Sequence, residues 1–382
     1  MISLIIFLFI LGLLVVVHEF GHFIIAKRVG VRVEKFSLGL GRKLFSKQKG
    51  DTQYCINAIP LGGYVKLAGD NAEDFKGNSD EYLSQPPGKR AAIILFGPLL
   101  NYALGFLFFW LIFFVGYPSL TTKVGGLVDD FGAKEAGIQI GDKIVAVDGQ
   151  KISLWEDLQK IIKAKKSGTK VKLSVLRNDR ESTIEAKIKE EQASDLLGQK
   201  HSIGLLGIRP GDEFIKVRHG FLKSFSLSIN KTVELTTLTY KALWRMITGK
   251  LAVRETVTGP LGMFYITSKA ASLGIIAVLH LVAVLSISLA IFNLLPMPVL
   301  DGGHIFFLVI EKLRGKALSL KIELIVTRIG FTLLISLAIL VTYNDILRVF
   351  QDRAQAKPDR EEAQLNHSVG LKKAIKIGVT NK

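Results

Sequence analysis

The chain has almost no cysteine. Cys55 is the only one among 382 residues, so neither an intrachain disulfide nor a cysteine-based zinc knuckle can form. The chain also lacks a basic stripe with interleaved aromatic residues. Lys and Arg outnumber Asp and Glu by 50 to 33, a net charge of +17, but this excess is spread over several loops. Nucleic-acid binding is therefore not expected.

Charged residues are absent from four long stretches, residues 1–17, 91–118, 270–300 and 329–344. The hydrophobic share of 49% and the mean hydropathy of +0.34 exclude a disordered chain and argue against a purely soluble enzyme. A helix needs about 20 apolar residues to cross a bilayer core. The second and third stretches meet this length, and the fourth does so if Arg328 extends to the interface.

The first stretch reaches the required length only if the segment His18–His22 lies inside the span. It has no basic residue before Lys27 and no small-residue cleavage site, so it is not expected to be a cleaved signal peptide. The simplest count is four membrane spans.

The loops at 26–90 and 304–322 have basic residues next to the spans, which by the positive-inside rule predicts that both are cytoplasmic. The region 119–273 then lies outside the cytoplasm. In this topology the first and third spans run in the same direction. Polar residues near their cytoplasmic ends can therefore meet at one depth.

The first span contains the sequence His18-Glu19-Phe20-Gly21-His22. Two histidines four residues apart lie on one face of a helix and can share one metal ion. Glu19 beside them can act as a general base on a water molecule. Zinc suits two imidazoles and a carboxylate with one open position. The alternative is a buried polar cluster that pairs helices, but ionisable residues inside an apolar span are functional by default.

Asp301 is the candidate third ligand. It is the first charged residue after Lys269, and Pro296, Pro298, Gly302 and Gly303 interrupt the helix around it. Broken backbone at membrane depth is tolerated only where it is buried or lines a wet cavity. By itself Asp301 could be a capping residue at a membrane-exit turn.

His280 and His304 are two further possible ligands. His280 lies far from Asp301 along the third span, and His304 lies about one helical turn beyond Asp301. For both, a structural role is the expected one.

These motifs resemble the site-2 protease family of intramembrane zinc metalloproteases, in particular its bacterial regulator of sigma-E protease type. The resemblance covers roughly residues 1–350 and rests on the His18–His22 motif and on residues 293–304, Asn-Leu-Leu-Pro-Met-Pro-Val-Leu-Asp-Gly-Gly-His. It implies that His18, His22 and Asp301 bind zinc and that Glu19 is catalytic. It also implies that Asn293 hydrogen-bonds the substrate backbone.

Other stretches are similar to further family features. Residues 97–101, Gly-Pro-Leu-Leu-Asn, resemble a motif at the start of the second span and make Asn101 a candidate substrate contact. Residues 56–67 resemble the family's membrane-re-entrant β loop and make Gly62, Gly63 and Tyr64 candidates as well. An unpaired strand edge there could add a substrate strand, whereas the alternative is a cytoplasmic hairpin without substrate contacts.

The external region resembles a PDZ domain over residues 124–190, where strand-like stretches at 124–128, 143–147, 171–176 and 183–188 surround a helical segment at 156–163. Such a domain could capture a carboxyl terminus, exclude bulky substrates, or serve only as a spacer. Residues 219–250 are amphipathic, which predicts either a helix pair on the outer membrane surface or an ordinary packed connector.

The predicted fold is a polytopic α-helical membrane protein with four transmembrane helices, a cytoplasmic-side membrane-re-entrant β loop and an inserted extracytoplasmic PDZ (α/β) domain. The expected segments are span one (1–26), the loop with the re-entrant hairpin (27–90), span two (91–118), the PDZ domain (119–192), a linker with interfacial helices (193–269), span three (270–303), a cytoplasmic loop (304–322), span four (323–350) and a charged, disordered tail (351–382).

The function expected from the residues and the resemblance is an intramembrane zinc endopeptidase with one Zn²⁺ per chain. Its expected substrates are single-pass membrane proteins of the anti-sigma-factor or remnant-signal-peptide type, already shortened by another protease. The expected location is the bacterial cytoplasmic (inner) membrane, with the lipid bilayer as partner. Two alternatives are a membrane-anchored PDZ scaffold with an inactive metal site and a transporter, although a transporter typically shows internal repeats.

Overall fold

The computed structural model describes residues 2–71, 73–194, 198–252, 257–316, 319 and 321–348. The predicted tail 351–382 lies outside the described residues. The chain forms two compact units. The first contains described residues of 1–101, 252–281 and 289–348, and the second contains those of 102–251 and 282–288.

Among the described residues, six α-helices lie wholly or partly in the first unit, and helices α2 and α8 continue into the second. They are α1 (Ile2–Arg28), α2 (Pro87–Val115), α7 (Pro260–Leu273), α8 (Ile275–Asn293), α9 (Asp301–Arg314) and the helix Lys321–Arg348. A short 3-10 helix covers Tyr82–Ser84. In the described chain, α1, α2, α8 and Lys321–Arg348 are long and apolar enough to cross a membrane. The predicted number of four such segments is confirmed.

The predicted third span and the loop after it differ from the structure. Residues 270–303 do not form one helix, because Gly274 has φ 101° and separates α7 from α8. After α8, a short turn with Pro296 and Pro298 precedes α9. The segment 304–322, predicted as a loop, is helical up to Arg314, where Gly315 in the left-handed conformation ends α9.

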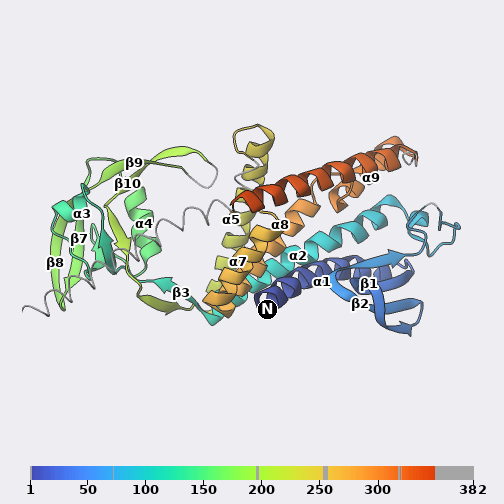
Figure 1. The fold of residues 1–382 in the computed structure, drawn as a ribbon, viewed down its shortest axis with the longest axis horizontal. Coiled ribbons are helices and arrows are strands. Elements are labelled where there is room, and N and C mark those ends of the chain that lie inside the picture. Colours follow the sequence, from blue (N-terminus) through green and yellow to red (C-terminus); the bar gives the residue numbers. More distant parts are fainter. Residues whose placement is uncertain are drawn as a thin grey trace, which may run out of the picture. The chain divides into compact units, whose positions relative to one another are not determined.

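A two-stranded antiparallel sheet lies beside α1 (Figure 1), with strands β1 (Val33–Lys49) and β2 (Thr52–Leu67). Both strands bend back on themselves: Phe36 lies opposite both Val65 and Tyr54. The first half of β1 therefore lies between the two halves of β2, and the second half of β2 is an edge. This edge follows α1 closely, since a Cβ on Gly12 would lie 2.9 Å from the Pro60 carbonyl oxygen.

A small apolar core joins α1, the sheet and α2 near the carboxyl end of α1. Its buried members are Ile25, Ala26, Val31, Val33, Leu67 and Ile93. Burying aliphatic side chains removes apolar surface from water and fixes the sheet against the two helices.

The last helix also holds the start of α7. Buried Asp345 accepts hydrogen bonds from the backbone N–H groups of Gly259 (3.2 Å) and Gly262 (2.8 Å). Its carboxylate thus caps the N-terminus of α7, whose first backbone N–H groups have no partner within the helix, although Asp345 lies far from α7 in sequence. A Cβ on Gly259 would lie 2.7 Å from the carboxylate oxygen Oδ2 of Asp345, which explains the glycine there.

The second unit contains an α/β region around a four-stranded sheet of order β6-β5-β7-β8. Its elements are β3 (Tyr117–Leu120), β4 (Val124–Leu127), α3 (Gly132–Glu135), β5 (Lys143–Val147), β6 (Gln150–Lys151), α4 (Trp155–Lys163), β7 (Lys170–Arg177), β8 (Arg180–Lys187), β9 (Lys189–Ser194), β10 (Lys200–Leu205), β11 (Ile208–Pro210) and β12 (Phe214–Val217). The strands and the helix expected between residues 124 and 190 are all present.

The α/β region has its own buried core, which includes Trp155, Leu158, Val171, Leu173 and Val175. Strand β7 alternates between buried and outward-facing residues, as expected for a sheet with one face on a core.

Helix α5 (Phe221–Ile247) corrects the predicted helix pair. The amphipathic segment forms one continuous helix because it contains no glycine or proline between Gly220 and Gly249. Its first turns pack on α2, where the rings of Trp110 and Phe221 have centroids 4.7 Å apart.

Candidate metal centre and active site

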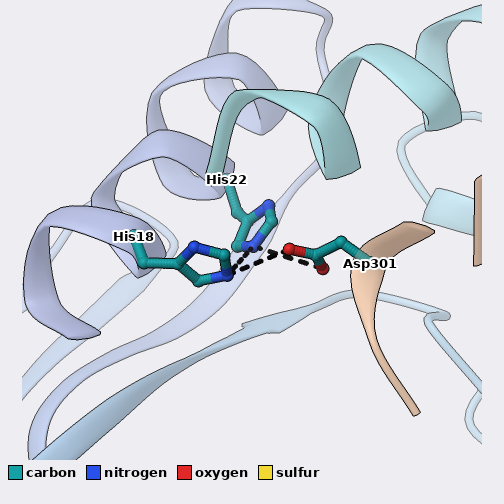
Figure 2. Close-up of side chains that lie close together, drawn as sticks. All are labelled: His18, His22 and Asp301. Carbon is teal, nitrogen blue, oxygen red and sulfur yellow. Dashed lines mark hydrogen bonds and ion pairs between the residues drawn. The ribbon is translucent and has the colours of Figure 1, made fainter. Parts of the chain in front are cut away.

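Helix α1 presents His18 and His22 on one face, as their spacing requires. Their Nε2 atoms lie 3.1 Å apart, and the ring centroids are 4.7 Å apart. Figure 2 shows both rings pointing from α1 toward Asp301, which comes from a different part of the chain.

Asp301 reaches the two histidines because it is the first residue of α9. Its Oδ2 lies 3.0 Å from Nε2 of His18, and its Oδ1 lies 3.7 Å from Nε2 of His22. The turn before it is compact: a Cβ on Gly302 would lie 2.3 Å from the Leu294 carbonyl oxygen, and one on Gly303 would lie 2.1 Å from that of Met297. Only glycine fits at these two positions, so the residues after Asp301 set where its carboxylate lies.

Helix α2 covers the imidazoles through a close backbone approach. A Cβ on Gly21 would lie 2.2 Å from the Phe96 carbonyl oxygen, so α1 and α2 touch backbone to backbone here. A Cβ on Gly97 would lie 2.3 Å from Cε1 of His22 and 3.0 Å from Cε1 of His18. Gly97 therefore leaves the space that the two rings occupy.

Backbone and amide groups orient the two rings. Nδ1 of His22 lies 2.9 Å from the carbonyl oxygen of Ile93. Because a carbonyl oxygen can only accept, Nδ1 carries the proton and Nε2 of the neutral ring presents a lone pair toward Asp301. On His18, Nδ1 lies 3.5 Å from the side-chain amide nitrogen of Asn293.

The three side chains fit a zinc ion. Within the described chain they form the one cluster of at least three His, Cys, Asp or Glu residues close enough to hold a metal. Tetrahedral ligand atoms around zinc lie roughly 3.3–3.6 Å from each other, and the measured separations run from 3.0 to 3.7 Å. The buried Oδ2 of Asp301 accepts no hydrogen bond from the described residues. A cation would satisfy these converging lone pairs.

Glu19 lies at the same site but is held by the sheet. Its Oε2 accepts a hydrogen bond from the backbone N–H of Val65 on β2, 3.1 Å away. Glu19, His22, Asp301 and Val65 line one cavity of about 660 Å³. A water molecule and a peptide strand could therefore reach the carboxylate and the ligand atoms from the same space.

The other predicted substrate contacts lie at different distances from this centre. Asn293 is beside His18, and an added Cβ on Gly63 would lie 3.9 Å from Cγ of Glu19. Gly62, with φ 93°, faces Val15 of α1, and the ring of Tyr64 faces Lys35 instead of the metal ligands. Asn101 is fully buried in α2. None of these five predicted contacts is among the described residues that line the cavity.

The two alternative ligands are not part of the cluster. His304 lines the cavity one turn into α9, and His280 is an exposed residue of α8. The three-residue cluster contains neither of them.

Sequence reasoning missed two features of the cavity wall. Asp70, directly after β2, accepts a hydrogen bond from the backbone N–H of Leu67 at 3.2 Å. Arg90 of α2 forms an ion pair with Glu311 of α9, and both side chains are largely buried. The turn at Ala68–Gly69 could have drawn attention to Asp70, whereas nothing in the sequence pairs residues 90 and 311.

Comparison with known proteins finds zinc metalloprotease relatives. The sequence profile of peptidase family M50 matches residues 6–337. The Agrobacterium fabrum protein Atu1380, which bears a zinc metalloprotease name, is 32% identical over 358 residues, or 89% of this chain and 94% of that protein. The zinc metalloprotease RasP of Oceanobacillus iheyensis is 29% identical over 430 residues, or 92% of this chain and 100% of that protein.

A solved PDZ domain of an SdrC-like protein from Listeria monocytogenes is also similar, at 25% identity, covering 25% of this chain and 90% of that domain. Its TM-score of 0.20 is too low to support an argument about the fold.

The four apolar helices and the two sequence relatives define the protein as a multi-pass membrane zinc metalloendopeptidase. The chain belongs to peptidase family M50, the site-2 protease family.

Proposed function

We propose that the protein is an intramembrane endopeptidase that cleaves the membrane-spanning segments of single-pass membrane proteins. The observation that carries the proposal is the cluster of His18, His22 and Asp301, because His22 and Asp301 line a cavity together with Glu19. The whole His18–His22 motif lies in a helix long and apolar enough to span a membrane. Hydrolysis of a peptide bond inside the membrane requires catalytic residues that lie in membrane-spanning helices.

His18, His22 and Asp301 would hold one zinc ion per chain. When bound, zinc polarises a peptide carbonyl and lowers the pKa of a coordinated water. Glu19 accepts a proton from the attacking water and delivers it to the leaving amine. The carbonyl of Ile93 keeps His22 in the tautomer whose Nε2 faces Asp301.

The substrate would bind as an extended strand beside β2, with Asn293 and the Gly62–Tyr64 segment among its contacts. A membrane helix hides its peptide carbonyls in intrahelical hydrogen bonds, so it must unwind before cleavage. The second half of β2 is a sheet edge on the cavity wall, and an edge can pair with an unwound strand. Anti-sigma factors and remnant signal peptides, already shortened outside, are the substrate types that the family resemblance suggests.

The sheet β1–β2 would enter the membrane from the cytoplasmic side. Pro60 of β2 contacts Gly12, which lies 16 residues before Arg28 at the end of α1, or about 24 Å along the helix. Several large apolar side chains of the sheet are exposed, as expected for contact with lipid: Leu40, Leu44, Phe45, Ile56 and Ile59.

The α/β region would be a PDZ domain on the extracytoplasmic side of the bacterial inner membrane. Lys27 and Arg28 end α1, and Lys312 and Arg314 end α9, which favours the cytoplasm for both ends. With four spans, residues 119–273 would then face the opposite side. A groove of about 180 Å³ between α4 and Leu205–Ile208 is where this domain could contact a substrate.

The experiment that tests the proposed site measures zinc content and cleavage in Asp301→Ala and His304→Ala. The reporter is a truncated single-pass protein reconstituted with the enzyme. Losing an outer-shell partner costs about 10–100-fold in metal affinity, so Asp301→Ala should lose at least that much, and cleavage with it. His304→Ala should retain zinc. The opposite pattern, with zinc lost only in His304→Ala, would contradict the ligand set.

A further inference from the structure

Two carboxylates accept hydrogen bonds from backbone N–H groups on the edge of β2. The N–H of Val65 donates to Oε2 of Glu19 at 3.1 Å, and the N–H of Leu67 donates to Oδ2 of Asp70 at 3.2 Å. Positions i and i+2 of a strand point their N–H groups to the same side. Both donors therefore point away from β1, toward the open edge.

This edge is the side that faces the catalytic cavity. Val65 and Leu67 pair with Phe36 and Val33 of β1 on their other side. Val65, Leu67, Glu19 and Asp70 all line the cavity that contains His22 and Asp301. A strand that approached the ligands through this cavity would meet the two carboxylates before it met the backbone donors.

Charged side chains at an open edge usually prevent unwanted strand pairing. Strand addition depends on main-chain hydrogen bonds for its affinity. A substrate strand needs the same two N–H groups that Glu19 and Asp70 now occupy. Asp70 lies only three residues beyond its donor, so the turn between them keeps its carboxylate close to the N–H of Leu67.

We propose that Asp70 is a specificity-determining residue that, together with Glu19, keeps the β2 edge closed to any segment that cannot displace both carboxylates. An unwound segment that takes the N–H of Val65 also releases Glu19 from the β2 edge. Strand binding and release of the base are then one event. A segment that stays helical offers no free carbonyl and leaves Glu19 held. This inference rests on the proposed function.

The test compares the kinetics of wild type, Asp70→Ala, Asp70→Asn and Asp74→Ala in phosphatidylcholine vesicles. The probe is a synthetic lysine-flanked membrane segment with two central glycines and a fluorophore–quencher pair. Asp70→Asn can still cap the turn as a weaker, neutral acceptor. Asp74→Ala is the matched control, because Asp74 lies in the same loop but pairs with Lys66 and Asn71 instead of an edge donor.

One net hydrogen bond corresponds to about two- to tenfold in an equilibrium constant. Asp70→Ala should therefore lower KM by about two- to tenfold with kcat within twofold of wild type, Asp70→Asn should lower it less, and Asp74→Ala should leave it unchanged. An unchanged or higher KM in both Asp70 variants would overturn the proposal and leave Asp70 as a turn cap. If wild type cleaves no membrane segment at all, the proposed function itself fails, and the inference fails with it.

Discussion

The geometry of the candidate metal centre depends on close approaches of backbone to side chain that leave no room for an added methyl group. The rings of His18 and His22 lie where a Cβ of residue 97 would be, within 3.0 Å of it. The orientation of His22 depends on one backbone carbonyl, that of Ile93. The sequence predicts both histidines, Asp301 and Glu19 as site residues because charged and imidazole groups are conspicuous in apolar helices. It could not find Ile93, because the contribution of that residue is a carbonyl that every residue has.

Gly97→Ala should therefore weaken zinc binding without removing any ligand. The added methyl group forces the imidazoles or α2 to move, which disturbs the hydrogen bond from His22 to the Ile93 carbonyl. Changing such an outer-shell partner costs about 10–100-fold in metal affinity. Competition of the enzyme with a zinc chelator measures this loss. Gly88→Ala is the matched control, since it lies in the same helix and a Cβ there meets nothing within 4 Å. Equal zinc affinity in both variants would show that the close approach of Gly97 to the two imidazoles does not affect zinc binding.

At the scale of helices and strands, hydropathy and the positions of proline and glycine predicted most of the helices. Four stretches without charge gave four long apolar helices, since length and composition decide whether a helix can span. The fine structure around Asp301 was not predictable from these averages. Whether the chain resumes a helix at 301 depends on the packing of Gly302 and Gly303 against carbonyls of the preceding turn.

The β1–β2 sheet was also only partly predictable from local sequence. A hairpin was expected at residues 56–67, but the full strands run from Val33 to Lys49 and from Thr52 to Leu67. Their doubled register, with Phe36 facing both Val65 and Tyr54, is set by long-range pairing and not by local pattern. The edge formed in this way positions Glu19, and no sequence motif marks that contact.

At the scale of the whole molecule, the proposed topology places the loop 26–90 and the region 119–273 on opposite sides of the membrane. The single native cysteine, Cys55, is buried and gives little background labelling. Cysteines placed at exposed Asp179 and Glu73 should therefore report their own side. A membrane-impermeant maleimide should label Asp179→Cys in intact spheroplasts, and Glu73→Cys only after permeabilisation. The reverse labelling would invert the topology.

The central claim is that this chain hydrolyses peptide bonds within the membrane with Glu19 as the base. The most direct measurement compares cleavage of a truncated single-pass reporter by wild type and by Glu19→Gln, with zinc content determined on the same samples. General-base catalysis contributes about 10²–10⁴-fold. We expect Glu19→Gln to lose at least about a hundredfold in kcat while it keeps its zinc. Equal cleavage by the two proteins would contradict the account.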